Sequence, residues 1–395
     1  MQAFFIQMRE VPMVSAFQFS VPQDVLFGKG SLEKLPEILE KLGSQKLLII
    51  SGRHLNKMGT VSRVAEMVAA KNIGYVTYTD VAPNPTVQMV EEAAELYRQS
   101  GASSILALGG GSPMDVAKAV AVVVTYGGNI TEYEGSETVP GPTVPVIAIP
   151  TTAGTGSEVT AASVITDTDR NYKLTVFSRR LIPSYAILDP ELLSTMPFSV
   201  ATSTGIDAMI HALEAYISRA ATPFTDAMAE KALELIGPNL RRFAANRQDE
   251  DAAAAMLLGS MFAGLSFTWA RTGNVHAMSH PVSAYFHVSH GLANAILLPV
   301  ILEFNQLADH GRYEKIYNYI KKVPSPSQNF TPDLLVHEVR NLLNDLSIPQ
   351  HLAEVGVKEE LIEQMAADAM KSGNIAVNPR QTTVEDVIAL YRKAM

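Results

Sequence analysis

The sequence predicts two domains: an α/β domain with a parallel sheet at residues 1–195 and an all-helical domain at residues 196–395. Two observations predict this division. Short apolar runs alternate with helical patterns up to about residue 195, and long Ala-, Leu- and Met-rich helical patterns replace them from Pro197 onwards. At roughly 100–200 residues per domain, a chain of 395 residues is also long enough to bury two cores.

The apolar runs of the first part are typical of buried parallel strands. They are Lys46–Ser51, Tyr75–Tyr78, Ser104–Leu108 and Val144–Ile149. The segments between them, such as Val61–Lys71 and Val87–Ser100, carry apolar residues at three- and four-residue spacing and are predicted to be helices. Such alternation indicates a doubly wound α/β domain, which binds ligands at the carboxyl ends of its strands.

The second part of the chain is predicted to be helical, because its apolar residues recur at helical spacing and convincing strand patterns disappear. The helical patterns cover Gly205–Ala220, Thr225–Asn246, Ala252–Thr268, Leu334–Leu346 and Val384–Lys393.

Composition excludes several classes of partner. There are 40 acidic and 31 basic residues, a net charge of −9, whereas nucleic acids and anionic membranes bind clustered Lys and Arg. The chain has no cysteine, so a metal must take nitrogen and oxygen ligands. Met1–Met13 lacks the basic region of a secretion signal, and the apolar stretch Val116–Val124, interrupted by Lys118, is too short to span a membrane. We therefore expect a cytoplasmic protein with no nucleic-acid or membrane partner.

A glycine-rich turn follows the strand Ser104–Leu108 directly, with the sequence Gly109-Gly110-Gly111-Ser112-Pro113-Met114-Asp115. Glycines let the backbone approach a ligand closely, and Ser112, Pro113 and Asp115 fit the N-cap, first-turn and capping-box positions of the next helix. The start of that helix offers free N–H groups and a positive dipole end to a diphosphate. A plain strand-to-helix turn is the alternative, since the spacing is not the G-x-G-x-x-G fingerprint.

A second loop of small and hydroxyl residues, Pro150–Glu158, follows the strand Val144–Ile149. Its residues, Thr151 and Thr152 among them, suit hydrogen bonds to phosphates and ribose. Two such loops after two strands of one sheet fit a dinucleotide better than either loop does alone.

Five of the nine histidines lie in two short segments, which is typical of a metal site. Asp207 and His211 are four residues apart in a helical pattern, so their side chains share one helix face. The other four histidines of the group lie within 15 residues of sequence: His276, His280, His287 and His290. Imidazole and carboxylate ligands suit a divalent transition metal. His287 is expected to be exposed and outside the site.

These motifs together resemble the iron-dependent (group III) alcohol dehydrogenases, the family that includes lactaldehyde reductase, 1,3-propanediol dehydrogenase and butanol dehydrogenase. The resemblance covers nearly the whole chain, in the order Val25–Gly30, Gly109–Asp115, Pro150–Thr160, Asp207–Glu214, His276–Gly291 and Asn378–Arg380. It implies the dehydroquinate synthase-like fold, in which an α/β dinucleotide-binding domain and an all-helical metal domain enclose the active site. It also implies hydride transfer between C4 of a nicotinamide and a small primary alcohol or aldehyde, and a homo-oligomer, a dimer or larger.

Carried over by position, the resemblance implies a role for each site residue. The metal ligands would be Asp207, His211, His276 and His290, and His280 would relay a proton near the substrate. The metal would be Fe(II), although nitrogen and oxygen ligands also accept Zn(II). The contacts to the dinucleotide would be Gly109, Gly110, Gly111, Ser112, Asp115, Thr151, Thr152, Thr160 and Lys173.

The chain departs from the family after the first strand that the family shares. Many NAD-using members have an acidic residue there that binds the adenosine ribose, whereas this chain has Gly52 followed by Arg53. An acid repels a 2′-phosphate, while Gly52 leaves space for it and Arg53 supplies a cation. We therefore expect NADP(H) to be preferred over NAD(H).

A second departure lies near the expected substrate pocket. Arg271 and Lys371 stand where family members have small or apolar residues, and two cations would suit an aldehyde that carries a carboxylate, phosphonate or sulfonate. The alternative, which we favour, is that both cations face solvent or pair with Asp or Glu. Phe267 completes the candidate substrate contacts.

Three other functions stay open. A glycerol dehydrogenase-like polyol dehydrogenase, or a dehydroquinate synthase relative, would share the fold but arrange its ligands differently. A maleylacetate reductase-like enzyme needs no metal and would not require all four ligand positions to be filled, as they are here. A non-catalytic nucleotide-binding protein would not require metal ligands beside nucleotide loops.

Overall fold

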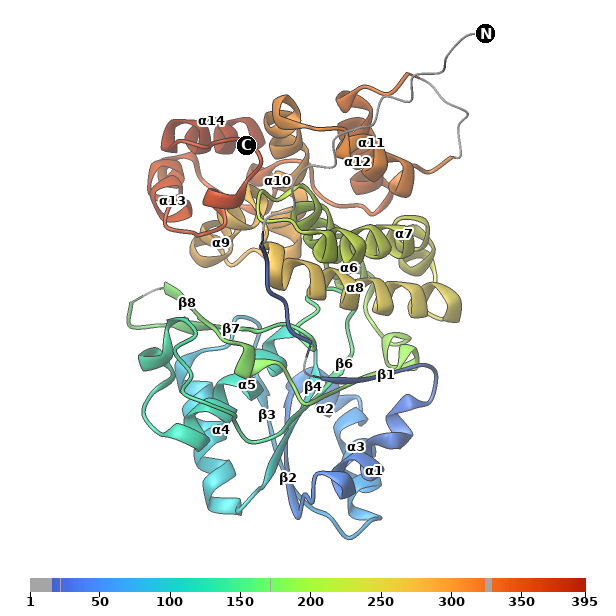
Figure 1. Ribbon diagram of the computed structural model, residues 1–395, viewed down its shortest axis with the longest axis vertical. Helices are drawn as coiled ribbons and strands as arrows, with labels where there is room; N and C mark the ends of the chain where they lie inside the picture. Colours follow the sequence, from blue (N-terminus) through green and yellow to red (C-terminus); the bar gives the residue numbers. More distant parts are fainter. Residues whose placement is uncertain (1–15, 22, 171, 324–328) are drawn as a thin grey trace.

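The computed structural model describes residues 16–395 except 22, 171 and 324–328, so the Met1–Met13 stretch lies outside the described residues. An α/β unit lies at the bottom of Figure 1 and a helical unit lies above it. The described strands all fall between Asp24 and Leu188, and the helical unit begins with α6 (Phe198–Ile217). The fold class expected from the sequence is confirmed.

Six parallel strands form the central sheet of the α/β unit, in the order β1-β9-β6-β4-β2-β3. They are β1 (Asp24–Phe27), β2 (Lys46–Gly52), β3 (Gly74–Val81), β4 (Ser104–Gly109), β6 (Val146–Pro150) and β9 (Tyr185–Leu188). The four strands expected from the sequence are β2, β3, β4 and β6. The sequence patterns do not predict β1 and β9, because each has only four residues and β1 lies exposed at the edge of the sheet.

Alternate residues of the central strands point to opposite faces of the sheet, and helices cover each face. Leu48 and Ile50 of β2 pack on the side of α4 (Val87–Ser100) and α5 (Gly111–Tyr126). Leu47 and Ile49 pack on the side of α1 (Leu35–Lys41) and α3 (Thr60–Ala69). Figure 1 shows the two helix layers on either side of the strands. Because both faces are buried, strands such as β2 are apolar at nearly every position.

A second, smaller sheet lies between the α/β unit and the helical unit (Figure 1). It consists of β7 (Ala162–Asp167) and β8 (Tyr172–Phe177), which run antiparallel, and the short β5 (Gly135–Ser136), which pairs with β8 in parallel. The alternation of β and α units predicts only parallel strands, whereas the two strands of a hairpin have no helix between them. The hairpin is therefore a correction to the expected topology.

The helical unit contains α6 (Phe198–Ile217), α7 (Pro223–Ala245), α8 (Glu250–Ala270), α9 (Asn274–Phe286), α10 (His290–Asn305), α11 (Arg312–Ile320), α12 (Pro332–Asp345), α13 (Ile362–Ala369) and α14 (Val384–Ala394). The short helical segments are α2 (Arg53–Lys57), η1 (Ser31–Lys34), η2 (Ile130–Tyr133), η3 (Arg179–Leu181), η4 (Pro190–Leu193), η5 (Gln306–Ala308), η6 (Leu352–Val355), η7 (Glu359–Leu361) and η8 (Ile375–Val377). Every residue of α6 from Gly205 to Ile217 is buried, so α6 is the core helix of this unit.

Two helical segments, Glu250–Ala270 and His290–Ala308, have the length and apolar composition of a membrane span. Most of their residues are buried inside the helical unit, where α8 packs on α6 and α7 and α10 packs on α6 and α9. Core helices of this kind are apolar around most of their circumference because most of their surface is kept from water.

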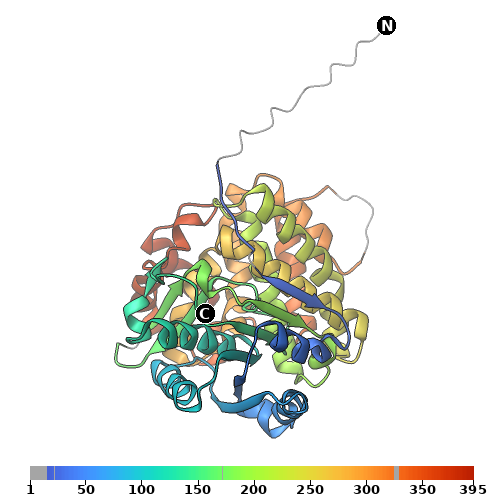
Figure 2. The ribbon, with the colours of Figure 1, turned by 60° about the horizontal axis from the view of Figure 1, so that its bottom comes forward.

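The chain ahead of β1 connects the two units. From β1 it crosses to the helical unit, as Figures 1 and 2 show, and the ring of Phe19 stacks there on Phe224 of α7 with centroids 3.8 Å apart. The side chain of Gln23 donates a hydrogen bond to the backbone oxygen of Glu158 at 2.6 Å. These contacts join the edge of the sheet and the loop after β6 to the helical unit.

Candidate active site

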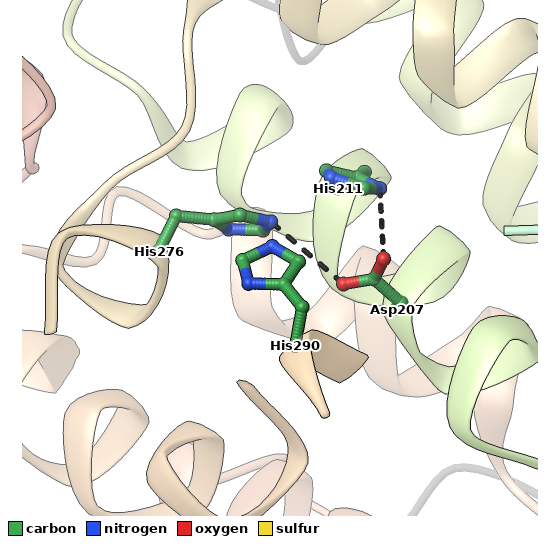
Figure 3. A group of neighbouring side chains, drawn as sticks. All are labelled: Asp207, His211, His276 and His290. Atoms are coloured by element: carbon green, nitrogen blue, oxygen red, sulfur yellow. Dashed lines mark ion pairs between the residues drawn. The ribbon is translucent and has the colours of Figure 1, made fainter. Parts of the chain in front are cut away.

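Four side chains from three helices point toward one another in Figure 3. Asp207 and His211 project from successive turns of α6, His276 from the first turn of α9, and His290 from the first residue of α10. One donor atom from each lies within 4.8 Å of the other three. The structure therefore brings together the four residues named from the sequence as metal ligands, and we call them the four-donor cluster.

Close packing of α10 on α6 brings the side chains of the four-donor cluster together. A Cβ atom at Gly291 would lie 2.1 Å from the backbone oxygen of Ser203, so a larger residue there would force the two helices apart. Ser203 precedes Asp207 by one turn of α6, and His290 is the neighbour of Gly291. The contact at Gly291 thus holds His290 beside Asp207.

Glu214 fixes the orientation of the His276 ring. Its Oε2 lies 2.6 Å from Nδ1 of His276, and its Oε1 accepts the backbone N–H of Val275 at 2.7 Å. With Nδ1 held by Glu214, the Nε2 atom of His276 faces Asp207 at 3.8 Å and keeps its lone pair. Burial raises the pKa of Glu214 to about 7. The sequence offered one signal for this role: Glu214 follows His211 by three residues and so lies on the same face of α6.

Asn294 braces the cluster from the next turn of α10. Its Nδ2 atom donates to Oδ1 of Asp207 at 2.7 Å and lies 3.2 Å from Nε2 of His276 and 3.1 Å from Nε2 of His290. The side chain is fully buried, so it holds the carboxylate of Asp207 without competition from water. Only its spacing of four from His290 could have indicated this position in the sequence.

The chemistry of the cluster fits a divalent cation. Burial, reinforced by the neighbouring imidazoles, holds the pKa of His276 and that of His290 well below the usual range, so both rings are neutral. The buried Nδ1 atom of His211 has no hydrogen-bond partner among the described residues. Neutral imidazoles, an unpartnered ring nitrogen and a buried carboxylate are what a cation with nitrogen and oxygen ligands requires.

His280 and Phe267 lie against the four-donor cluster. The ring centroid of His280 is 5.3 Å from that of His290, and Phe267 stacks on His211 with centroids 4.3 Å apart. Burial is the main cause that lowers the pKa of His280 to about 4, so its ring is neutral and can accept a proton. His287 ends α9 in the left-handed conformation and is exposed, as expected.

The glycine-rich turn opens α5, but its capping differs from the expectation. The helix begins at Gly111 with Gly110 as N-cap and without a side-chain cap, so Ser112 lies inside the first turn. Cβ atoms at Gly110 and Gly111 would lie 3.1 Å from Oγ1 of Thr152 and 2.9 Å from Cγ2 of Thr155. Because glycines permit this close approach, the helix starts early and its first N–H groups stay open at the carboxyl end of β4. Such groups can bind a diphosphate.

Asp115 and Thr160 belong to a buried network around Lys118. The Nζ atom of Lys118 donates to Oγ of Ser157 and to the backbone oxygen of Thr160, both at 3.0 Å. The Ser157 hydroxyl donates to Asp115 at 3.0 Å, so Asp115 supports the second loop and does not complete a capping box. Burial raises the pKa of Asp115 to about 6 and lowers that of Lys118 to about 8. A single lysine inside an apolar helix was the sequence signal for this network.

The nucleotide loops meet each other and the helical unit. The N–H of Thr151 donates to the backbone oxygen of Gly109 at 2.9 Å, which joins the loop after β6 to the turn after β4. A Cβ atom at Gly154 would lie 2.6 Å from Cβ of Thr204, a residue of α6. The loops therefore lie against the helix that carries Asp207.

Lys173 of the hairpin bonds to the segment between β3 and α4. It lies on β8, is half-buried, and donates to Oδ1 of Asn84 at 2.8 Å. After burial, its positive charge is a further cause of the lowered pKa of His280. The hairpin that the sequence patterns missed thus carries a cation whose charge acts on His280.

Gly52 and Arg53 lie at the carboxyl end of β2, beside β4 and its glycine-rich turn. Arg53 is not the free cation that the sequence implied, because its Nε lies 2.6 Å from Oδ1 of Asp80 on β3. No sequence pattern predicts this ion pair, since 27 residues separate its members.

Among the described residues, Arg271 and Lys371 make their polar contacts with groups that do not belong to the four-donor cluster. The exposed guanidinium of Arg271 donates to the backbone oxygen of Gly373 at 3.3 Å, and Lys371 pairs with Asp368 at 2.6 Å. These contacts match the favoured alternative, in which the cations face solvent or pair with an acid. The backbone of Arg271 has φ 60° and ψ 178°, a region essentially restricted to glycine.

Comparisons with known proteins agree with this geometry. Residues 22–190 match the model for iron-containing alcohol dehydrogenase, and residues 201–395 match the model for the C-terminal part of the Fe-containing alcohol dehydrogenase family. The chain belongs to the iron-containing alcohol dehydrogenase family. It is therefore an oxidoreductase that interconverts alcohols and aldehydes with a nicotinamide cofactor, and the non-catalytic alternative is wrong.

Members of the iron-containing alcohol dehydrogenase family resemble this chain over almost its full length. Lactaldehyde reductase of Escherichia coli (strain K12) is 37% identical over 371 residues, which cover 93% of this chain and 97% of that protein. The crystal structure of a 1,3-propanediol oxidoreductase has a TM-score of 0.93 at 34% identity and covers 96% of this chain and 100% of its own. Sulfoacetaldehyde reductase from Bifidobacterium kashiwanohense, in complex with NAD+, has a TM-score of 0.86 at 29% identity, with coverage of 96% and 99%.

Glu214→Gln tests the orienting role of the buried carboxylate. The amide keeps the size of the side chain but loses the charge that holds the Nδ1–H of His276, so we expect affinity for Fe(II) or Zn(II) to fall about 10- to 100-fold. Competition with a chelator of known affinity measures the change. Glu234→Gln is the matched control, because Glu234 is exposed on α7 and pairs with Lys231. Equal metal affinity in the two variants would contradict the orienting role.

Arg271→Gly tests the strained backbone at the end of α8. Glycine adopts the observed φ and ψ without steric cost. We therefore expect the variant to be more stable than the parent, with a free energy of unfolding about 1 kcal/mol larger. Arg271→Ala keeps a Cβ atom and loses the same guanidinium, so it separates backbone strain from the contact with Gly373. Urea unfolding measures both, and a glycine variant no more stable than the alanine variant would argue against strain.

Proposed function

We propose that the chain reduces a small primary aldehyde, and oxidises the corresponding alcohol, with NADP(H) and one divalent metal. The observation that carries this proposal is the convergence of one carboxylate and three imidazoles beside two nucleotide loops. Each part of the geometry supports one part of the reaction.

The four-donor cluster would hold the cation, and the family supports Fe(II) rather than Zn(II). When bound, a divalent cation acts as a Lewis acid toward an alcohol or carbonyl oxygen. Glu214 and Asn294 keep His276 and Asp207 turned toward the centre of the cluster. Phe267 covers one side of His211 with an apolar ring and excludes water there.

His280 moves the proton of the reaction. Its ring lies beside His290, and its pKa of about 4 keeps it neutral near pH 7. A neutral imidazole at this place accepts the proton that an alcohol hydroxyl releases, and it returns a proton when an aldehyde is reduced. Because its pKa is low, His280 passes the proton on to water rather than retaining it.

The nucleotide loops bind the cofactor diphosphate through the open N–H groups of α5 and the hydroxyls of Thr151 and Thr152. Lys173 influences the pKa of His280, which supports a place for it near the nicotinamide, where the cofactor gives or takes a hydride at C4. The absence of a carboxylate at Gly52, with Arg53 next to it, supports binding of a 2′-phosphate. We propose that NADP(H) is preferred but that NAD(H) also binds, because the related sulfoacetaldehyde reductase is in complex with NAD+.

The substrate that we propose is small and uncharged. Related proteins are a lactaldehyde reductase and a 1,3-propanediol oxidoreductase by name. Arg271 and Lys371 are engaged by Gly373 and Asp368, so the contacts of these two cations do not favour an anionic aldehyde. We also propose a homo-oligomer, from the family resemblance, and a cytoplasmic location, from the acidic composition without cysteine.

A metal-replacement assay with short aldehydes tests this proposal. We expect chelator-treated protein to be inactive, and anaerobic Fe(II) to restore oxidation of NADPH with an uncharged C2–C4 aldehyde, because the donor set needs a cation. The assay compares kcat/KM for NADPH and NADH. A tenfold preference for NADH, about 1.4 kcal/mol, would contradict the cofactor proposal. Failure of every divalent metal to restore activity would contradict the metal proposal.

His280→Gln tests the proton relay. Glutamine keeps polar atoms near the cluster but cannot shuttle a proton, so we expect kcat to fall about 100-fold or more while bound metal per chain stays the same. His287→Gln is the control, because His287 is exposed and outside the cluster. Full kcat in the His280 variant, or loss of its metal, would show that His280 has another role.

A further inference from the structure

An exposed ion pair joins the carboxyl ends of two neighbouring strands of the central sheet. The Nε atom of Arg53, the residue after β2, lies 2.6 Å from Oδ1 of Asp80 on β3. The two side chains are 73% and 59% exposed, so a ligand can reach both charges. Nearby, the amide of Asn56 donates to the hydroxyl of Thr79 at 3.3 Å, a second contact between the segment after β2 and the end of β3.

An irregularity in β3 delivers Asp80 to this position. Ile50 pairs with Tyr78, but Gly52 pairs with Val81, so β3 contains one residue more than β2 over this stretch. Such a bulge changes the direction of the side chains beside it and is frequent near functional sites. Here it places the Asp80 carboxylate next to Arg53.

Gly52 cannot easily carry a side chain of its own. A Cβ atom there would lie 3.3 Å from the backbone oxygen of Val81, a tight contact with backbone that cannot move freely. The carboxylate at this part of the edge therefore comes from the neighbouring strand. β2 lies between β3 and β4. Arg53 therefore follows the strand next to the glycine-rich turn, and Asp80 lies on the strand after that.

In open parallel sheets the dinucleotide lies across the carboxyl ends of the strands, with the diphosphate at the glycine turn and the adenosine ribose at the next strand. On this sheet the next strand is β2, so the ribose faces Gly52 and the Arg53–Asp80 pair. We propose that Asp80, by accepting a 2′-hydroxyl and by holding Arg53, sets how strongly the chain discriminates between the 2′-hydroxyl and the 2′-phosphate of the cofactor. This inference rests on the proposed dinucleotide site and adds the residue that limits its preference for NADP(H).

The two charges act in opposite directions on a 2′-phosphate. Asp80 repels the phosphate and offsets part of the positive charge of Arg53, so a phosphate that pairs with Arg53 binds less tightly while Asp80 is ionised beside it. A 2′-hydroxyl donates a hydrogen bond to Asp80 and leaves the ion pair in place. Arg53 therefore favours NADP(H) and Asp80 opposes it.

Calorimetric titration of the full-length, metal-loaded chain with NADPH and NADH, without substrate, tests the inference. We expect Asp80→Asn to tighten NADPH binding about tenfold and to leave NADH binding unchanged or a few-fold weaker. Arg53→Gln should weaken NADPH binding more than NADH binding. In the double variant the gain from Asp80→Asn should shrink, because no guanidinium remains for the phosphate to bind.

Glu37→Gln is the matched control, since it removes one exposed, ion-paired acid of the same unit. Glu37 pairs with Lys41. After Glu37 itself, charges at Tyr185 and Asp24, the first residues of β9 and β1, raise the pKa of Lys41, so this pair lies at the opposite end of the strands from the glycine-rich turn. A change in the ratio of the two dissociation constants smaller than twofold in Asp80→Asn, or an equal change in both constants, would overturn this inference alone. Absence of dinucleotide binding by the parent chain would overturn the proposed cofactor as well.

Discussion

The burial of one carboxylate among three imidazoles is the constraint on which the helical unit depends. Desolvation raises the pKa of Asp207 and lowers that of His276, so each group would be costly to bury alone. Contacts from outside the cluster offset part of this cost: Glu214 holds His276, and Asn294 holds Asp207. Because these four residues lie on α6, α9 and α10, satisfying the cluster also fixes how the three helices pack.

The segment that carries His276 is anchored by a part of the chain about one hundred residues away. The side chain of Asn378 accepts the backbone N–H of Asn274 at 3.3 Å, and Asn378 also exchanges hydrogen bonds with Asn305 at the end of α10. A Cβ atom at Gly273 would meet both Glu214 and Asn378 within 3.0 Å. The Asn378–Arg380 motif therefore acts as a support for the metal centre, which gives a physical reason for its place in the resemblance.

Local patterns predicted the parts of the molecule that local physics determines. β2 and β4 are apolar because helices cover both faces, and Asp207 and His211 share a helix face because of their spacing. The hairpin β7–β8 and the contact of Lys118 with Thr160 depend on segments that meet only in the folded chain. The expected cap at Ser112 was wrong because the fit of the glycines against the second loop, a tertiary contact, moved the helix start.

The contacts at the cofactor end of the site explain why family membership determines the type of reaction but not which of the two dinucleotides is preferred. The metal donors and the glycine-rich turn are each confined by a close contact, of Gly291 with the backbone of Ser203 and of Gly111 with the side chain of Thr155, so a larger residue at either position disturbs the packing. Arg53 and Asp80 are exposed at the ends of two strands, so a substitution of either residue changes the local charge without moving the sheet. In the proposed cofactor site, selection between 2′-hydroxyl and 2′-phosphate can therefore vary while the four-donor cluster stays the same.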